Sequence, residues 1–342
     1  MNLPAMSTTG RPPQPALVIV NPRAGGGVSE RRWARFVGAV SSGLGEVDVC
    51  FTEARGHARE LARDAALAGR ALVVAFGGDG TISEVAGGLL STAAGPPAAG
   101  PATTTTTAET ATAPAASPPL CALGIIPRGT GGDFRRTLEL PHDIAQAAAR
   151  IRDSAPRVVD VGRVSFTTPE GALESRTFVN VASFGFSSNV AERANHASKA
   201  FGAKAAFLGA TLRTLASYDN NEVFLEIDGG PPVRRTLMLA AVGKGRYFGG
   251  GMKICPDARL DSGALSLVLV GDLGKMEVVT NLHRLFAGTH LTLDDVRGLS
   301  IQRLSARPVA PDQLIPVELD GETPGHLPAT FEILPRALRI RF

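Results

Sequence analysis

The chain has 342 residues, of which 44% are hydrophobic, and this length exceeds a typical single hydrophobic core, so two domains are expected. The formal net charge of +3 is small and dispersed, and the chain has two Tyr and one Trp. This composition excludes the clustered basic and aromatic surface of a nucleic-acid-binding protein, while it suits phosphate ligands or an anionic membrane surface.

The first part of the chain alternates predicted strands and helices. Residues 1–15 are rich in Pro, Thr and Gly and are expected to be a disordered tail. The apolar runs and helical spacings that follow predict strands at 16–20, 47–52, 72–76 and 120–126, and helices at about 29–40, 57–69, 81–90 and 143–151. Such alternation predicts a parallel sheet with helices on both faces, which we assign to a domain of residues 16–155.

Residues 91–119 interrupt this alternation. They are mostly Ala, Thr, Pro and Gly, with a run of Thr at 103–107. A segment of this composition buries too little apolar surface to order itself, so it predicts a disordered insertion that projects from the sheet.

A glycine-rich turn follows the strand at 72–76, with the sequence Gly77-Gly78-Asp79-Gly80-Thr81. Glycines between a strand and a helix let backbone N–H groups approach an anion, and the helix dipole favours negative charge there. Thr81 and Glu84 have the spacing of a capping box, which predicts that the helix begins at Thr81. The Asp79 carboxylate would repel phosphate unless a metal ion lay between them, so the turn predicts phosphate together with Mg²⁺.

Two further predicted strands of this domain also end in glycine-rich turns, after residues 20 and 126. The carboxyl ends of parallel strands meet at one edge of a sheet, where ligands bind in such folds. Three glycine turns at this edge predict a nucleotide-binding site more strongly than one turn does.

The second part of the chain reads as a mostly antiparallel β domain, residues 156–342, with the character of a sandwich. Helical stretches are expected at 188–217 and 275–288. The predicted strands are 158–166, 176–181, 223–227, 235–242, 264–270, 298–304, 317–319 and 329–342. The predicted fold class is therefore α/β plus β, with the active site in the cleft between the two domains.

The three cysteines, Cys50, Cys121 and Cys255, are far apart and lie in apolar segments. Their odd number and placement predict buried free thiols and a reducing compartment. No signal peptide and no transmembrane run of about 18 apolar residues is predicted, so we expect a cytoplasmic protein.

Taken together, the motifs resemble those of the diacylglycerol kinase catalytic family, in its branch of bacterial lipid kinases related to sphingosine kinases. The resemblance covers roughly residues 16–342 without the insertion. Its motifs are Asn21–Gly25, Gly77–Thr81, Ile126–Phe134, Asp160–Gly162, Asn180–Gly185, Gly249–Met252 with Pro256–Ala258, and Asp320–Glu322.

The resemblance implies an ATP-dependent and Mg²⁺-dependent kinase of a lipid hydroxyl, with ATP in the interdomain cleft. It implies that Glu322 accepts the proton of the lipid hydroxyl and that Asp79 faces the catalytic Mg²⁺ through water. The residues implied at the nucleotide are Asn21, Pro22, Arg23, Ala24, Gly25, Thr52, Gly78, Gly80, Thr81, Glu84 and Thr130. The residues implied as supports are Asp133, Asp160 and Lys199.

The chain departs from the family pattern at several positions. Ala24 and Gly26 replace a Ser and a Lys, and Gly132 replaces an Asn. Some members bind a structural Mg²⁺ through the second Asp of an Asp-Asp-Gly string, where this chain has Asp261-Ser262-Gly263. A neutral hydroxyl is a poor ligand for a hard cation, which leaves Asp261 as the candidate ligand for that ion.

The acceptor stays open at this point. Diacylglycerol is the first expectation and a sphingoid or other lipid alcohol the second. An NAD kinase shares the Gly-Gly-Asp-Gly-Thr turn, and a lipid- or nucleotide-binding homologue with weak catalysis is a non-enzyme alternative. A lipid acceptor implies peripheral contact with the inner face of a membrane. The oligomeric state is left open.

Overall fold

The computed structural model describes residues 14–24, 30–92, 118–129, 132–190, 211, 213–215 and 217–342. Most of the predicted tail, the predicted insertion and the helical stretch expected at 188–217 therefore lie outside the described residues.

The N-terminal half contains four parallel strands in the order β2-β1-β3-β4. The strands are β1 (Ala16–Val20), β2 (Val47–Phe51), β3 (Leu72–Gly77) and β4 (Ala122–Pro127). The helices are α1 (Glu30–Leu44), α2 (His57–Leu67), α3 (Asp79–Ser91), α4 (Asp133–Thr137) and α5 (Ile144–Asp153).

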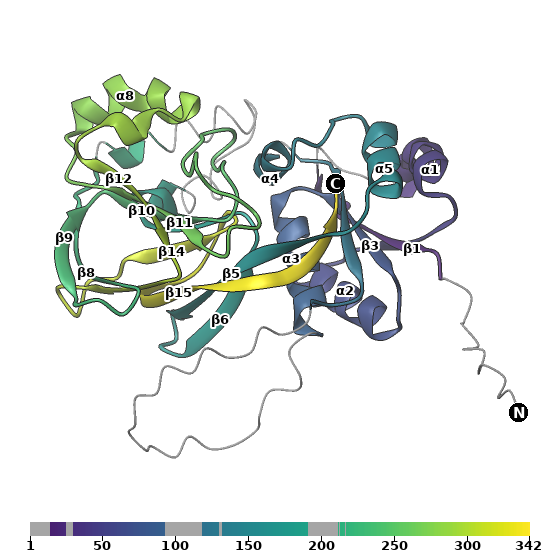
Figure 1. Ribbon diagram of the computed structural model, residues 1–342, viewed down its shortest axis with the longest axis horizontal. Helices are drawn as coiled ribbons and strands as arrows, with labels where there is room; N and C mark the ends of the chain where they lie inside the picture. Colours follow the sequence, from purple (N-terminus) through teal and green to yellow (C-terminus); the bar gives the residue numbers. More distant parts are fainter. Residues whose placement is uncertain are drawn as a thin grey trace, which may run out of the picture.

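Both faces of this sheet are covered by helices. Successive residues of a strand point to opposite faces, so Val73 and Ala75 pack under α2 and α3, while Val74 and Phe76 pack under α1 and α5. Trp33 of α1 lies edge-on to Phe76, with ring centroids 5.2 Å apart. The predicted parallel sheet between two helical layers is confirmed, and α5 lies beside α1 in Figure 1.

The C-terminal half is a β-sandwich. One sheet runs β12-β11-β10-β7-β14, and the other gathers β5, β6, β13, β8 and β9 around β15. Large side chains from both sheets, including Phe166, Phe184 and Phe331, fill the core between them. The strands are β5 (Arg157–Thr167), β6 (Leu173–Phe178), β7 (Val181–Gly185), β8 (Asn221–Ile227), β9 (Val233–Leu237), β10 (Leu239–Gly243), β11 (Leu265–Val270), β12 (Val296–Ile301), β13 (Arg303–Pro308), β14 (Pro316–Leu319) and β15 (Glu322–Arg341).

The outer face of the first sheet carries helix α8 (Lys275–Ala287) and the short 3₁₀-helix η2 (His290–Thr292). A separate apolar cluster fills the space beneath them, with Met238, Ile254 and Val268 among its buried members. The helix expected at 275–288 is therefore confirmed, and Figure 1 shows it lying across the sandwich on the side away from β15.

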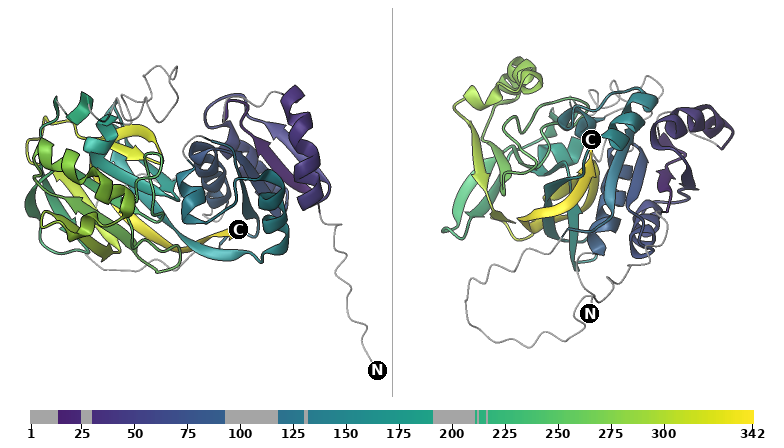
Figure 2. Two further views of the ribbon diagram at one scale, coloured as in Figure 1. Left: turned by 90° about the horizontal axis from the view of Figure 1, so that it is seen from above. Right: turned by 45° about the vertical axis from the view of Figure 1, so that its right-hand side comes forward.

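The two halves share one long strand. β15 pairs with β14 at its start, with β13 and β5 along its middle, and in parallel with β4 at Ile340 and Arg341. Figure 2 shows β15 and β5 running side by side from the sandwich to the N-terminal sheet. The hydrogen-bonded sheet is thus continuous through both halves, and the end of β15 forms part of the first core.

Three of the predicted strands are each two strands in the structure. The expected strand 235–242 divides into β9 and β10, 298–304 spans β12 and β13, and 176–181 spans β6 and β7. In each case the two strands lie in different sheets, so the chain crosses the sandwich at the break. A continuous run of strand-forming residues does not reveal such a crossing, because both strands have the same local propensity.

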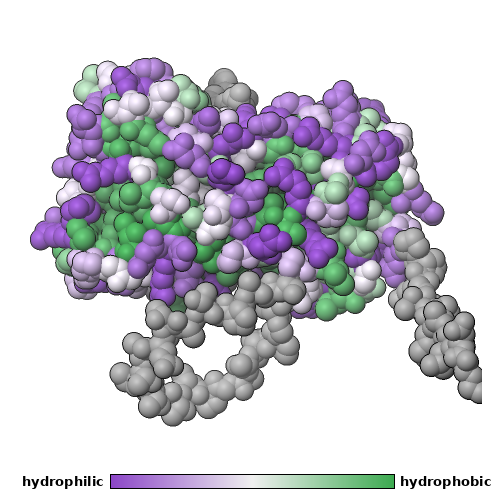
Figure 3. All heavy atoms as spheres, viewed as in Figure 1, coloured by the Kyte–Doolittle hydropathy of each residue, from purple (hydrophilic) through white to green (hydrophobic). Residues whose placement is uncertain are grey.

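The surface view in Figure 3 shows hydrophilic side chains interspersed with apolar patches over both halves. Among the described residues, no helix is both long and apolar enough to cross a bilayer.

Candidate active site

The carboxyl ends of the parallel strands meet at one edge, as their register requires. Val20 of β1 is aligned with Phe51 and Phe76, and Gly77 of β3 is aligned with Pro127 of β4. The turns after these strands therefore lie together. The Asn21 side chain joins two of them, because its amide Nδ2 donates to the Thr81 hydroxyl over 3.0 Å.

The glycines of these turns are needed for close packing. A Cβ on Gly77 would lie 2.5 Å from the Thr81 hydroxyl, and a Cβ on Gly129 would lie 2.9 Å from the Cα of Gly78. The turns after β3 and β4 therefore touch through bare backbone. The N-terminus of α3 opens directly behind them, with Gly78 as its N-cap, and such a helix end favours an anion.

The Asp79 carboxylate connects the turn after β3 to helix α4. Its two oxygens accept the backbone N–H groups of Asp133 and Phe134, each over 3.1 Å. Asp133 in turn accepts the N–H of Gly250 from the second half over 2.8 Å and pairs with Arg136 at 2.7 Å. Burial raises the pKa of Asp133, and the nearby Asp79 carboxylate raises it further.

The predicted capping box of α3 is wrong. Helix α3 begins at Asp79 rather than Thr81 and has no side-chain cap. The Glu84 carboxylate instead accepts the N–H groups of Gly56 and Ala58, over 3.0 and 3.2 Å, at the start of α2. Because α3 starts two residues earlier than expected, Glu84 lies beyond its first turn and faces the N-terminus of α2, whose unpaired N–H groups it satisfies.

The second half contributes the hairpin turn between β14 and β15. Asp320 and Gly321 both have positive φ, 46° and 94°, as a two-residue turn of this kind requires. The Asp320 carboxylate accepts three backbone N–H groups, those of Val179, Asn180 and Val181, over 3.1–3.3 Å. Burial is the largest effect on this group and raises its pKa to about 7.

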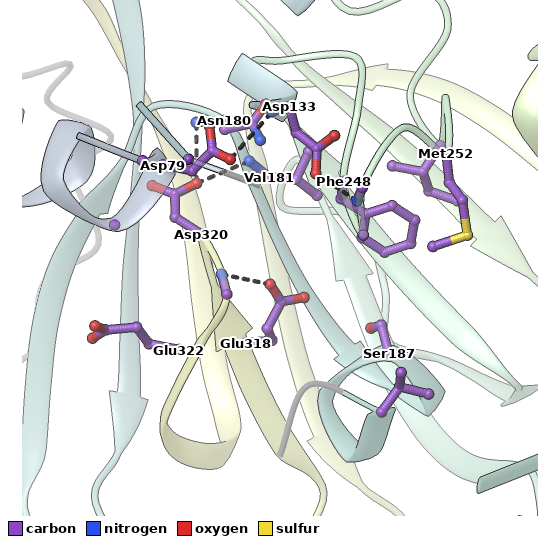
Figure 4. A pocket seen from close by; sticks show the side chains of 18 of the residues that line it. Asp79, Asp133, Asn180, Val181, Ser187, Phe248, Met252, Glu318, Asp320 and Glu322 are labelled. Atoms are coloured by element: carbon purple, nitrogen blue, oxygen red, sulfur yellow. Dashed lines mark hydrogen bonds between the residues drawn. The ribbon is translucent and has the colours of Figure 1, made fainter. Parts of the chain in front are cut away.

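Two glutamates flank this turn, and Figure 4 shows their side chains pointing to opposite sides of it. Glu322 pairs with Arg55 at 2.8 Å and with Arg176 at 3.7 Å. Glu318 is buried; it accepts the N–H of Gly321 over 2.8 Å and the Ser183 hydroxyl over 2.5 Å. Burial raises the pKa of Glu318, while those two hydrogen bonds oppose the rise.

One cavity of about 1060 Å³ joins these groups. Its polar end is lined by the three turns and by Asp79, Asp133, Asp320 and Glu322. Its other end lies under α8 and is apolar. The apolar lining includes Phe186, Met238, Val270, Leu282, Leu285 and Val296.

The structure brings most of the sequence-predicted nucleotide residues to this cavity. Those that line it are Asn21, Pro22, Arg23, Ala24, Thr52, Gly78, Asp79, Gly80, Thr81 and Glu84. Glu322 and Asp133, expected from the same resemblance, also line it. Gly25, Thr130 and Lys199 lie outside the described residues.

Two predicted residues lie elsewhere. Asp160 is buried in an ion pair with Lys244 and is absent from the lining of the described cavity. Asp261 is exposed between Arg157 at 3.7 Å and Arg259 at 3.9 Å. Among the described residues, no group of three or more His, Cys, Asp and Glu side chains is arranged to hold a metal ion.

The donor set at the polar end nevertheless suits Mg²⁺ held jointly with phosphate oxygens. Asp79 lines this end with a carboxylate, and an ion of this type keeps several waters and shares phosphates with few protein ligands. The touching glycine turns leave the backbone bare where phosphates would lie.

Arg55 and Glu318 were not predicted from the sequence, and Asp320 was part of a predicted motif without a role of its own. Glu318 and Asp320 are both close to Glu322 in sequence, but Leu319 pairs with Glu322 across the hairpin, so Glu318 and Glu322 lie on opposite faces of it. Arg55 lies in the loop before α2, and nothing in its local sequence indicates that it reaches Glu322.

Comparisons with known proteins identify the family of this chain. Residues 15–164 match the family model described as diacylglycerol kinase catalytic domain, and residues 180–342 match that of the YegS C-terminal NAD kinase beta sandwich-like domain. The chain is 30% identical over 303 residues to "Probable lipid kinase YegS-like" of Pseudomonas savastanoi pv. phaseolicola, covering 86% of this chain and 83% of that one. It is 27% identical over 326 residues to the diacylglycerol kinase of Bacillus subtilis, covering 95% of each.

A crystal structure of a diacylglycerol kinase from Bacillus anthracis str. Sterne has the same fold, with a TM-score of 0.64, 21% identity and 96% of both chains covered. A parallel α/β half joined to a β-sandwich is the architecture that this chain shares with that protein. Among proteins of this architecture, this chain belongs to the diacylglycerol kinase catalytic-domain family of lipid kinases.

Proposed function

We propose that this chain transfers the γ-phosphoryl group of ATP to the hydroxyl of a lipid, with diacylglycerol as the first acceptor. The observation that carries the proposal is the single cavity with a glycine-lined polar end, a row of carboxylates and an apolar chamber. Such a cavity suits a substrate whose hydroxyl must meet a phosphate while its hydrocarbon stays out of water. Relatives named diacylglycerol kinase support the choice of acceptor.

At the polar end, the backbone N–H groups of the glycine turns and of the α3 N-terminus would hold the phosphates. Arg128 lines the same end, with its guanidinium 4.6 Å from the centre of the Phe36 ring. Gly26 stands where the family pattern has a Lys, and we propose that Arg128 supplies part of that missing positive charge. Asp79 would hold Mg²⁺ through water, and that ion would offset the charge of the phosphates during transfer.

Glu322 is the group to which we assign the proton of the attacking hydroxyl. The lipid oxygen forms a bond to the γ-phosphorus, its proton passes to the carboxylate, and ADP leaves with the electron pair of the broken bond. Burial raises the pKa of both Glu318 and Asp320, which favours their neutral forms. Glu322 is partly exposed at the cavity and pairs with Arg55 and Arg176.

At the apolar end, α8 both lines the chamber and exposes apolar side chains to solvent. Leu282 and Leu285 face the chamber, while Met276 and Val279 on the same helix are 74% and 47% exposed. Phe286 both lines the chamber and is 53% exposed. A helix that exposes apolar residues beside a lipid-sized chamber suits peripheral contact with a membrane from which the substrate enters.

The proposal is tested by incubating the purified chain with radiolabelled ATP and Mg²⁺ and identifying each product by chromatography and mass spectrometry. The acceptors are diacylglycerol in mixed micelles, sphingosine, monoacylglycerol and NAD. Labelled phosphatidic acid is the expected product. Labelling of sphingosine alone would change the acceptor, labelling of NAD alone would overturn the lipid assignment, and no product from a folded, ATP-binding chain would favour a non-catalytic homologue.

A further inference from the structure

The second half contains a completely buried lysine. Lys244 follows β10, has 0% exposure and donates from Nζ to Asp160 Oδ2 over 3.0 Å. A buried ammonium requires paired and hydrogen-bonded surroundings, because its transfer from water is costly. Neither Lys244 nor Asp160 lines the cavity described above, so the pair has a role outside that site.

The ammonium group is surrounded by three oxygens. Besides Asp160, Nζ donates to the Ala264 carbonyl over 2.9 Å, and it lies 3.5 Å from the Ser262 hydroxyl. An ammonium has three N–H donors, so these partners match its capacity. The distances are those of N–H···O hydrogen bonds, whereas Mg²⁺ binds oxygen at about 2.0–2.1 Å and Ca²⁺ at about 2.3–2.6 Å.

Asp160 fixes the surrounding backbone at the same time. Its Oδ2 also accepts the N–H of Gly263 over 2.7 Å, and its Oδ1 accepts the N–H of Arg336 over 2.9 Å. Arg336 has a positive φ of 52° at an irregularity in β15. The Lys244–Asp160 pair thus ties together β5, the end of β10, the loop of residues 259–264 and the irregular part of β15.

The loop of residues 259–264 contains the string at which, by the resemblance, some members of the family hold a structural Mg²⁺, and its present residues do not fit that ion. Ser262 supplies a hydroxyl that lies 3.4 Å from the carbonyl of Arg259 and 3.1 Å from that of Ala264. Asp261 turns outward to two arginines. Asp160 is the one carboxylate bonded to this cluster in the described structure, and the Lys244 ammonium already occupies it.

We propose that the ammonium group of Lys244 is a built-in cation that holds the loop of residues 259–264, so that this chain binds no structural divalent ion there. The loop carbonyls that would face a metal are instead directed to the ammonium and to Ser262. The divalent-ion requirement of this chain is then confined to phosphate binding at the polar end of the cavity.

The first experiment uses the unaltered protein. After dialysis, native mass spectrometry is expected to show no bound divalent ion, and the thermal midpoint in EDTA is expected to match that in millimolar Mg²⁺ or Ca²⁺ within about 1 °C. The Asp79→Asn variant is measured in parallel, because it removes weak binding at the phosphate end. The proposal is overturned if the Asp79→Asn variant still holds a stoichiometric metal ion or still has a chelator-sensitive thermal midpoint.

The second experiment exchanges the cation. Lys244→Gln is expected to lower the thermal midpoint by roughly 10 °C, because it leaves the buried Asp160 uncompensated, and metal is not expected to restore it. Lys253→Gln, at a half-buried lysine of the same half, is the matched control and is expected to stay near the wild type. The double variant Lys244→Gln/Ser262→Asp is expected to gain a midpoint that rises with Mg²⁺ or Ca²⁺.

If the folded double variant shows no such metal dependence, the ammonium does not occupy a cation position and the proposal fails. If the variants do not fold, the metal content of the unaltered protein decides. These readouts need no enzymatic activity, so the proposal stands or falls separately from the lipid kinase assignment.

Discussion

The structural role of each carboxylate in this molecule depends on the groups that it contacts. Asp79 joins the turn after β3 to α4, Asp160 neutralises a buried lysine, and Glu84 satisfies the start of another helix. The sequence alone indicated that these side chains belong near a phosphate site. Their hydrogen-bond partners lie 26–176 residues away in the chain, which no local pattern specifies.

We expect Asp79→Asn and Glu322→Gln each to lower kcat by about 10²–10⁴-fold on the preferred lipid, because one loses the carboxylate for Mg²⁺ and the other the proton acceptor. Steady-state kinetics with saturating ATP measures the effect. Glu170→Gln, at an exposed loop carboxylate, is the control and should keep full activity. A Glu322→Gln enzyme as active as the parent would exclude the proposed base.

Glu84→Gln should act mainly on stability. Its carboxylate accepts two N–H groups at the start of α2, and losing that charge at a helix N-terminus costs about 1–2 kcal/mol. Urea unfolding measures this change. Glu60→Gln, in the exposed first turn of the same helix, is the comparison. Equal stability of the two variants would show that the cap contributes little.

At the scale of elements, the N-terminal half was the more predictable part. Its strands alternate with helices and are buried on both faces, so apolar runs and glycine turns mark their ends. The sandwich was less predictable, because a run such as 235–242 crosses between sheets without a change of composition. Helix α4, of five residues, was missed because it is shorter than the window in which periodicity can be read.

Helix α8 was expected from its spacing, but its place over the apolar chamber was not. We predict that Met276→Ser/Phe286→Ser reduces sedimentation with anionic lipid vesicles several-fold and lowers activity on vesicle-borne diacylglycerol. Activity on a short-chain diacylglycerol dissolved below its micelle concentration should change little. Leu67→Ser, at an exposed apolar residue of the other half, is the control. Unchanged vesicle binding would argue against α8 as the membrane-facing element.

At the scale of the whole molecule, the continuity of β15 predicts that both halves unfold together. Trp33, the single Trp, lies in the first half and reports on it. Leu304 is buried in the sandwich core opposite Phe331 of β15. Leu304→Ala should destabilise the protein by about 2–5 kcal/mol, and the Trp33 fluorescence transition should shift with it.

Ile340→Ala, at the end of β15 in the first core, is the matched variant and should give a similar shift. If Leu304→Ala leaves the Trp33 transition in place while circular dichroism shows an earlier loss of β structure, the two halves unfold separately.

Because β15 is the last strand to be synthesised, its pairing with β4 can form only at the end of translation. On the ribosome, β4 emerges long before Ile340 and Arg341, so the edge that they cover stays unpaired while the whole sandwich is being translated. The apolar face that Leu338 and Ile340 complete is open during the same interval. An early-folding half that must wait for a late segment is exposed to wrong pairing, and nascent-chain chaperones are expected to matter most in that interval.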